Sequence, residues 1–192
     1  WINGQYLDKK GLQKVKKDFL SARPFPYFVL HDFFRKDKLL EVRKAVLKEK
    51  FERKEIDLFS FSQTHELFVS KNKKIQEFYT FFSSKEFVDF ISQSTGQKLG
   101  KKADMHAHLF AQGDYLLFHD DVVEGRKVAY VVNLSQGFKN KDGGKLQLFD
   151  AQKPLHPAHE IMPEFNYFVC FQVSEKSLHA VEEVLSKKNR LT

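Results

Sequence analysis

A chain of 192 residues fits one domain, and a hydrophobic content of 42% with 21 Phe excludes a disordered protein and predicts an interior rich in aromatic rings. No apolar run approaches the roughly 20 residues that cross a bilayer, and no signal peptide is visible, although the chain begins at Trp1 and a removed leader stays open. The formal charge of +7 is spread over scattered Lys side chains, which indicates a solvated basic surface or, as the alternative, attraction to RNA or a ribonucleoprotein.

Cys170 is the only cysteine of the chain, so no intramolecular disulfide can form. It lies in the apolar run from Tyr167 to Phe171, which predicts a buried thiol. A reducing compartment fits this composition, and we expect a cytoplasmic protein, with the nucleus open as a second location.

The first half of the chain is predicted to be mostly helical. Residues 8–22 place Leu12, Val15, Phe19 and Leu20 on one stripe of an amphipathic helix, which the stretch Arg23-Pro24-Phe25-Pro26 brings to an end. Further helices are predicted over residues 37–50, 72–82 and 84–94, with Asn72 and Ser84 as caps and Gly96 as the terminator of the last one. A short strand is predicted over residues 27–33, and a mixture of strand and loop over residues 51–70.

From about Gly100 the sequence changes to short β-rich runs separated by Gly and Asp. These runs cover residues 105–112, 114–119, 127–134, 145–149, 159–162, 166–173, 177–184 and 189–192. Many short strands at close spacing predict a sandwich, a barrel or a jelly roll. We therefore expect one α+β, mainly β domain over residues 1–192, in which a helix-rich part (1–99) braces one face of a β core (100–192).

The clearest candidate for a metal site starts in the run Tyr115-Leu116-Leu117-Phe118-His119-Asp120-Asp121, a predicted strand that runs into a turn. Side chains two apart on a strand project from the same face, so His119 and Asp121 can point at one atom. His179, in the predicted strand 177–184, supplies a second imidazole far downstream. Two His and one carboxylate form the facial triad of non-haem Fe(II) enzymes, which leaves iron positions free for substrates.

A chain with eight His is about as likely as not to contain a His-x-Asp motif by chance, so the motif needs support from its surroundings. Arg190 follows His179 by about one hairpin length and lies two residues before Thr192, so Arg190 and Thr192 can share a strand face. Together they would form a receptor for a carboxylate. Taken alone, Arg190 would be assigned more readily to a surface salt bridge.

Two other His pairs are alternative metal sites. His106 and His108 also share a strand face, and His156 and His159 stand three apart in a loop flanked by proline. No Glu follows His108 at the spacing found in cupins, and Glu160 is the only carboxylate near the second pair. Both pairs are therefore less favoured, and a satisfied or exposed histidine is their ordinary role.

A longer series of motifs surrounds these residues. It consists of Tyr115 to Asp121, Glu124-Gly125-Arg126, Val128-Ala129-Tyr130-Val131-Val132-Asn133-Leu134, Asp142-Gly143-Gly144-Lys145-Leu146, Phe171-Gln172-Val173-Ser174, His179 and Arg190-Leu191-Thr192. The series resembles the prolyl-hydroxylase-like 2-oxoglutarate oxygenases, and within them the branch that hydroxylates a proline of a small-subunit ribosomal protein. Stretches near the start, such as Trp1-Ile2-Asn3 and Ser94-Thr95-Gly96, are similar too, so the resemblance spans most of the chain.

The resemblance implies a double-stranded β-helix, a jelly roll whose mouth holds iron through His119, Asp121 and His179. It implies Fe(II) as the metal, 2-oxoglutarate and O2 as cosubstrates, and leaves ascorbate open as a further cofactor. In the implied reaction, 2-oxoglutarate becomes succinate and carbon dioxide while a substrate C–H bond becomes C–OH.

The resemblance also implies which residues bind the cosubstrate. Arg190 and Thr192 would grip the distal carboxylate of 2-oxoglutarate, and Tyr115 would add a phenol hydrogen bond, with a core Tyr as its alternative role. Asn133 stands where relatives commonly carry Tyr, and its shorter side chain would alter the grip on the cosubstrate. Gly143-Gly144 would be the turn that joins two core strands, because glycine accepts a positive φ without cost. The relatives continue beyond the position of Thr192 with a further strand end, so a trimmed C-terminus stays open.

Three functions follow from these patterns. The first is a protein prolyl hydroxylase acting on a ribosomal protein, near RNA through its basic surface, without a membrane partner and with its oligomeric state open. The second is the same oxygenase chemistry on a nucleic acid or a small molecule. The third is a catalytically silent jelly-roll binding module that keeps the metal site for structure only.

Overall fold

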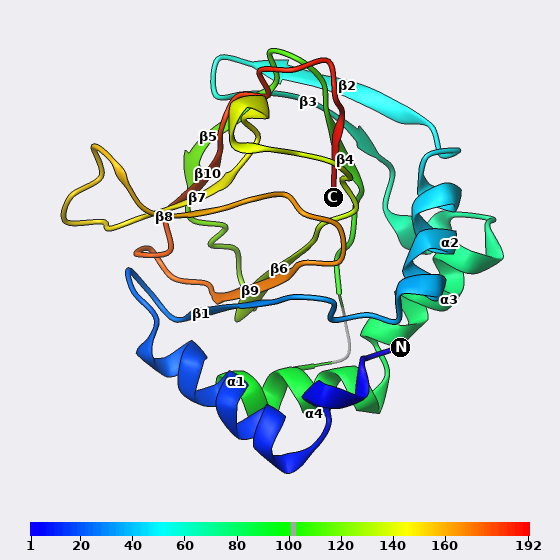
Figure 1. Cartoon of the computed structure of the whole chain (residues 1–192), viewed down its shortest axis with the longest axis vertical. Coiled ribbons are helices and arrows are strands. Elements are labelled where there is room, and N and C mark those ends of the chain that lie inside the picture. The colour runs from blue at the N-terminus through cyan, green and yellow to red at the C-terminus, as the bar shows by residue number, and fades with distance from the viewer. Residues whose placement is uncertain (101–102) are drawn as a thin grey trace.

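Two β-sheets form the centre of the computed structural model, which describes residues 1–100 and 103–192 (Figure 1). The strands are β1 (Tyr27–Leu30), β2 (Phe51–Ile56), β3 (Phe59–Thr64), β4 (His108–Phe110), β5 (Tyr115–His119), β6 (Val128–Val132), β7 (Leu146–Phe149), β8 (Pro157–Ile161), β9 (Phe168–Gln172), β10 (His179–Val181) and β11 (Arg190–Leu191). The larger sheet has the order β11-β4-β3-β5-β10-β7-β8, with β2 paired to β3, and the smaller sheet has the order β1-β9-β6. Each β run predicted from the second half of the sequence overlaps one of these strands, although β8 begins two residues before the run predicted over residues 159–162.

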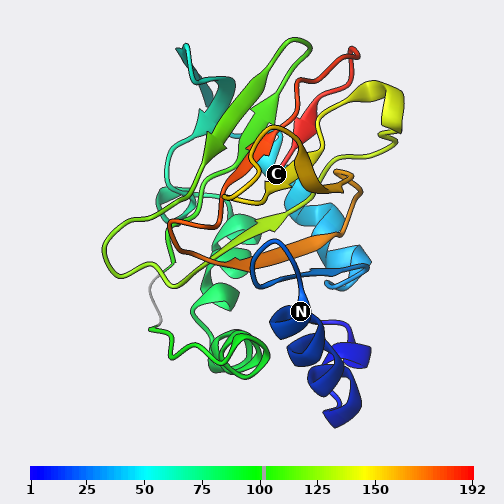
Figure 2. The ribbon, with the colours of Figure 1, turned by 90° about the vertical axis from the view of Figure 1, so that its left-hand side faces the viewer.

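Helices cover the outer side of the smaller sheet. They are α1 (Lys9–Ser21), α2 (Lys36–Val46), α3 (Lys73–Phe82) and α4 (Lys85–Thr95), with short 3-10 turns η1 (Gly4–Tyr6), η2 (Leu67–Val69) and η3 (Asn140–Asp142). Figure 2 shows α1 and α4 on the side of the smaller sheet that faces away from the larger one. The predicted caps are confirmed, since Asn72 and Ser84 accept hydrogen bonds from backbone N–H groups of α3 and α4. Gly96 ends α4 in the left-handed conformation, also as predicted.

The helix predicted over residues 37–50 is shorter in the structure, where α2 ends at Val46. Leu47 is exposed, so no apolar face would stabilise another turn. The mixed segment predicted after it forms the hairpin of β2 and β3, in which Phe51 pairs with Thr64 and Ile56 with Phe59.

Both sheets contain strands from the helix-rich part and from the β-rich part of the chain. Strand β1 pairs along its length with β9, and β3 pairs with both β4 and β5. Residues of β9 alternate between two cores: Phe168 and Cys170 pack toward the helices, and Val169 and Phe171 pack between the sheets. The buried thiol predicted for Cys170 is confirmed. Because β9, the middle strand of the smaller sheet, is covered on both faces, it packs against both the helices and the larger sheet.

Within residues 1–100 and 103–192, no helix combines the length and the apolar character needed to span a membrane.

Candidate metal centre

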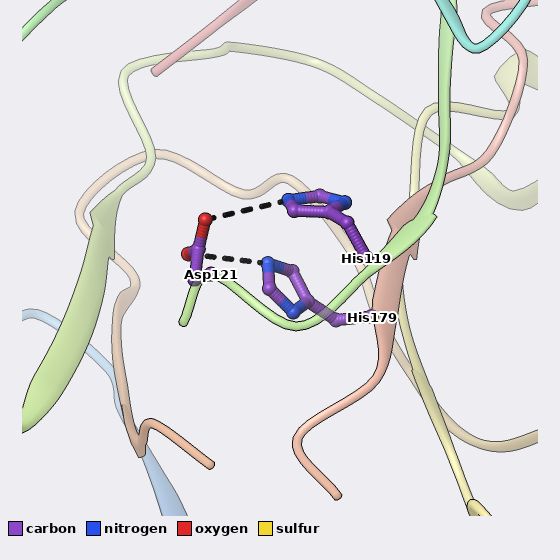
Figure 3. Close-up of side chains that lie close together, drawn as sticks. All are labelled: His119, Asp121 and His179. Atoms are coloured by element: carbon purple, nitrogen blue, oxygen red, sulfur yellow. Dashed lines mark ion pairs between the residues drawn. The ribbon is translucent and has the colours of Figure 1, made fainter. Parts of the chain in front are cut away.

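His119 and His179 face each other across two neighbouring strands. In the antiparallel pair of β5 and β10, His179 is the register partner of His119, and their ring centroids lie 4.1 Å apart. Asp121 follows the end of β5 with a φ of 62°, a left-handed conformation that Asp adopts more readily than most residues. This turn brings the Asp121 carboxylate back toward the two rings (Figure 3).

The three side chains converge on one point. The Nε2 atom of His119 lies 3.6 Å from Oδ1 of Asp121, and Nε2 of His179 lies 3.5 Å from Oδ2 of the same carboxylate (Figure 3). One ligand atom from each residue lies within 4.8 Å of the other two, and no other such group of His, Cys, Asp or Glu occurs in the part of the chain that the structure describes. The three residues selected from the sequence are therefore brought together.

Backbone carbonyl groups set the orientation of both rings. Nδ1 of His119 lies 3.0 Å from the Leu117 carbonyl oxygen, and Nδ1 of His179 lies 2.9 Å from the Ser177 carbonyl oxygen. A carbonyl oxygen only accepts hydrogen bonds, so Nδ1 donates in both rings. The lone pair of each neutral ring then resides on Nε2, which faces Asp121 and is the atom that a metal would bind.

The pKa values at this centre favour cation binding. Burial lowers the pKa of His119, and the neighbouring His179 lowers it further. Burial acts to raise the pKa of Asp121, but the hydrogen bond and charge of His179, with the charges of His119 and Arg126, outweigh it and hold that pKa below its usual value. A neutral imidazole and an ionised carboxylate are the protonation states that metal ligands need.

A cavity of about 1080 Å³ extends from the three side chains into the β core, and Arg190 lies in its wall. Only 2% of Arg190 is exposed. Its Nε donates a 2.8 Å hydrogen bond to the Gly144 carbonyl oxygen, and its guanidinium carbon lies 5.0 Å from the centre of the Phe110 ring. Burial lowers the pKa of Arg190 to about 9, so the group keeps its charge at neutral pH.

Arg190 forms no ion pair with any carboxylate in residues 1–100 and 103–192, so the surface salt bridge considered for it from the sequence is absent there. A buried charge without a counter-ion costs free energy, and an anionic ligand in the cavity would relieve that cost. Thr192 lines the same cavity, as expected if the two residues share a strand face.

Tyr115 and Asn133 do not line this cavity. The register between β5 and β10 shifts between His119 and Leu116, and the extra residue turns Tyr115 to the other face, where its hydroxyl donates to the Asp57 carbonyl oxygen. Asn133 is buried beside the start of β9, with its amide nitrogen 3.5 Å from the Tyr167 carbonyl oxygen. The phenol hydrogen bond that the resemblance implies for Tyr115 is therefore not supported by this arrangement, and the sequence pattern contains no signal for the bulge.

The alternative His pairs form no metal group among the described residues. His106 uses both ring nitrogens, one near the Thr64 carbonyl oxygen and one 3.1 Å from Glu66. His159 packs against the Tyr27 ring, and its predicted partner His156 is exposed. His108, by contrast, lines the cavity that contains Arg190.

Two residues of the cavity were not predicted as site residues from the sequence. Arg126 places a guanidinium nitrogen 3.5 Å from Oδ1 of Asp121 and donates to the Asp121 carbonyl oxygen at 3.3 Å. Its place in the Glu124-Gly125-Arg126 motif, directly after the ligand turn, was the available signal. Tyr130 on β6 also lines the cavity, and its buried hydroxyl has no hydrogen-bond partner among the described residues.

Comparison with known proteins identifies the family. Residues 105–192, which contain all three converging side chains and Arg190, match the model of the 2OG-Fe(II) oxygenase superfamily. The chain thus carries a 2OG-Fe(II) oxygenase domain over residues 105–192. The predicted resemblance to 2-oxoglutarate oxygenases is confirmed, and so is the prediction of an enzyme fold of this type.

The oxygenase is similar in sequence to proteins named as prolyl hydroxylases. It is 34% identical to prolyl 3-hydroxylase OGFOD1 of Xenopus laevis over 172 residues, which cover 87% of this chain and 33% of the relative. It is 31% identical to prolyl 3,4-dihydroxylase OGFOD1 of Ostreococcus tauri, over 90% of this chain and 37% of the relative. The chain thus spans about a third of the length of these relatives.

The fold of the oxygenase matches a prolyl-4-hydroxylase from Pseudomonas putida, with a TM-score of 0.71, 16% identity, and coverage of 92% of this chain and 94% of the other. This likeness confirms the predicted double-stranded β-helix with N-terminal helices. The superfamily takes its name from Fe(II) and 2-oxoglutarate, and the predicted cofactors are those of the superfamily. The site fits them, since two imidazoles and a carboxylate form the donor set of non-haem Fe(II) oxygenases.

Proposed function

We propose that this chain is an Fe(II)- and 2-oxoglutarate-dependent prolyl hydroxylase that acts in the cytoplasm on a prolyl residue of a small-subunit ribosomal protein. One observation supports it most: His119, Asp121 and His179 meet in a cavity whose wall holds a buried, unpaired Arg190. The prolyl substrate is supported by the relatives that are named prolyl hydroxylases.

Each side chain has a distinct role in this proposal. His119, Asp121 and His179 hold the iron, which together with 2-oxoglutarate and dioxygen supplies the oxidation of a C–H bond to an alcohol. Arg190 and Thr192 receive the distal carboxylate of 2-oxoglutarate. A guanidinium fork matches a carboxylate in geometry as well as in charge, and in a buried site the pairing is stronger than in water.

Neighbouring groups keep the ligands in position. The carbonyl oxygens of Leu117 and Ser177 fix both imidazole rings, and Arg126 pairs with the Asp121 carboxylate at 3.5 Å. Positions fixed in this way before substrate binding need little reorganisation during the reaction.

The entrance of the cavity supports a peptide substrate. Leu117, Phe118 and Val123 line the cavity next to the ligands and are between 45% and 58% exposed. Val122, between Asp121 and Val123, is 48% exposed. Contiguous apolar side chains on a surface are typical of binding sites for partners, and a proline-containing segment offers matching apolar surface. The positive charge of the chain favours encounters with an assembly that contains RNA.

The test is turnover of the purified chain with Fe(II), 2-oxoglutarate, ascorbate and dioxygen, in the presence of small-subunit ribosomal proteins or of RNA. Succinate is measured, and mass spectrometry searches each polymer for one added oxygen. We expect an oxygen on a prolyl residue of a ribosomal protein, and amino-acid analysis then separates 3-hydroxyproline from 4-hydroxyproline.

The other outcomes separate the alternatives. Added oxygen on RNA and not on protein would overturn the prolyl substrate while leaving the chemistry in place. A protein that binds metal but forms no succinate with any of these substrates would be a silent binding module. His119→Ala is the control, because succinate that persists in this variant does not come from the proposed site.

A further inference from the structure

The wall of the cavity near Arg190 is built from two paired strands. Arg190 of β11 is the register partner of Phe110 of β4, and Leu191 is the partner of Leu109. The ladder continues one residue further, since the backbone N–H of His108 donates to the Thr192 carbonyl oxygen at 2.8 Å and the N–H of Thr192 donates back at 3.0 Å. His108 is therefore directly opposite Thr192.

Side chains at opposed positions project from the same face of a sheet, and those of the next position project from the other face. The cavity lining obeys this rule: His108, Phe110, Arg190 and Thr192 line the cavity, whereas Leu109 and Leu191 belong to the core under the helices. Opposed side chains start about 5 Å apart and diagonal ones about 7–8 Å apart. The imidazole, the hydroxyl and the guanidinium thus form one small polar group on the cavity wall.

The side chain of His108 has no hydrogen-bond partner among the described residues, in contrast to three other His side chains. His106, His119 and His179 each place Nδ1 within 3.1 Å of a backbone carbonyl oxygen. His108 instead touches apolar rings, with its centroid 5.1 Å from that of Phe61 in an edge-on contact and 6.5 Å from that of Phe110. A polar side chain that lies among apolar rings and keeps a free hydrogen-bond donor is expected to bind a ligand.

We propose that His108 is a further cosubstrate-binding residue, whose imidazole N–H donates to the distal carboxylate of 2-oxoglutarate beside Arg190 and Thr192. The inference rests on the proposed function, because it assumes that this dicarboxylate occupies the cavity. A carboxylate accepts about four hydrogen bonds, so a guanidinium fork, a hydroxyl and an imidazole do not compete for the same lone pairs. Phe61 and Phe110 provide apolar walls for the methylene groups of the ligand.

The protonation state of His108 suits this role. Burial, with added repulsion from His106 and Arg190, lowers the pKa of His108 to about 4. The ring is neutral at pH 7 and donates one hydrogen bond without adding a second buried charge to that of Arg190. One guanidinium then neutralises one carboxylate.

The test measures binding instead of turnover, with Mn(II) in place of Fe(II). Two ligands are compared by calorimetry: 2-oxoglutarate and 2-oxopentanoate, which has the same chain but carries a methyl group where the distal carboxylate would be. His108→Phe keeps an aromatic ring and removes the donor, and His108→Asn and His108→Gln restore an N–H donor. We expect the dissociation constant for 2-oxoglutarate to be about tenfold higher in His108→Phe, and that for 2-oxopentanoate to change little. The better of the two amide variants should recover part of the affinity for 2-oxoglutarate.

Two results would overturn the inference: unchanged affinity for 2-oxoglutarate in His108→Phe, or an equal loss for both ligands, which would place the effect at the metal end of the cavity. If His108→Phe does not fold, His108→Leu, which also removes the donor, decides by the same ratio against the wild type. Failure of the wild type to bind 2-oxoglutarate would contradict the proposed function itself. Normal binding without prolyl hydroxylation would contradict only the proposed substrate.

Discussion

His119 and His179 are register partners on adjacent antiparallel strands, so one cross-strand pair supplies two of the three candidate metal ligands. The distance between the rings is set by strand pairing, which is more rigid than a loop. A shift of one residue in this register would turn one ring to the opposite face of the sheet. The ligand geometry therefore depends on the same hydrogen bonds that hold the sheet together.

Replacing any one of the three ligands is expected to abolish specific metal binding. His119→Ala, Asp121→Ala and His179→Ala should each weaken Mn(II) affinity by more than about 100-fold, because loss of a direct ligand exceeds the roughly 10- to 100-fold effect of its supporting partners. Calorimetric titration measures the affinity, and His156→Ala, an exposed histidine, is the control. Affinity retained in any of the three variants would show that the metal binds elsewhere.

Replacing Arg190 is expected to separate ligand binding from stability. Arg190→Met removes the carboxylate receptor and should weaken 2-oxoglutarate binding by about 30-fold or more, as for other buried charge pairs that lose one partner. It also removes a buried charge without a counter-ion, so the ligand-free variant should unfold at the same temperature as the wild type or higher. Thermal unfolding with and without 2-oxoglutarate checks both expectations.

The control for this measurement is Arg35→Met, because Arg35 is well exposed and does not line the cavity. A rise in unfolding temperature with 2-oxoglutarate in Arg190→Met equal to that of the wild type would contradict the assignment of Arg190.

The lowered pKa of His108 predicts a loss of stability in acid. The folded protein keeps His108 neutral down to its pKa of about 4, whereas the unfolded chain takes up a proton near the ordinary histidine pKa of 6.5. The unfolded state therefore binds more protons in this window, and the free energy of unfolding falls as the pH decreases from about 6.5 to 4, by up to roughly 3 kcal/mol from this group. Above pH 6.5 this contribution is fully present.

Denaturant titrations at several pH values measure this effect in the wild type and in His108→Asn, which has no titratable group at the position. The difference in the free energy of unfolding between the two proteins separates the contribution of His108 from those of the carboxylates and the other histidines. Parallel curves for the two proteins between pH 4 and 6.5 would contradict the buried, neutral state of His108.

Gly143 is predicted to tolerate no side chain. Its φ is 67°, and an added Cβ would lie 2.1 Å from the Glu183 carbonyl oxygen, which belongs to the backbone next to β10. Gly143→Ala should lower the free energy of unfolding by more than about 2 kcal/mol. Gly137→Ala is the matched control, since Gly137 has a φ of 71° with open space around it and should lose only about 1 kcal/mol. Equal losses in the two variants would mean that the contact with Glu183 is relieved by a small backbone shift.

The sequence predicted the elements well because their signals are local. The stripe of Leu12, Val15 and Phe19, the caps Asn72 and Ser84, and the terminator Gly96 each act within a few residues, and all lie where they were expected. Leu20, which was predicted on the same stripe, is exposed instead. The pairing of β1 with β9 joins residues more than 130 positions apart, and no local pattern specifies it. The resemblance to a known family predicted the jelly roll, whereas periodicity alone did not distinguish it from a sandwich or a barrel.

The candidate site also contains residues that local spacing predicted and residues whose positions depend on distant strand pairing. The spacing of His119 and Asp121 indicated a shared direction, and the structure brings them together with His179. Tyr115 was assigned to the cosubstrate only by the family resemblance, and the bulge in β5 directs its side chain away from the cavity. His108 was considered only as one of a pair with His106, because its position opposite Thr192 depends on a pairing between strands distant in the sequence.

The position of β1 at the edge of the smaller sheet has a consequence for how this domain is delimited. Residues 105–192 carry the family signature, yet the strand that completes the sheet beside β9, and the helices that bury Phe168 and Cys170, come from before residue 100. Expressed alone, residues 105–192 would expose an unpaired β9 edge and an uncovered aromatic layer, a combination that favours aggregation. The segment that matches the family model and the segment needed to complete the smaller sheet and its core thus have different borders.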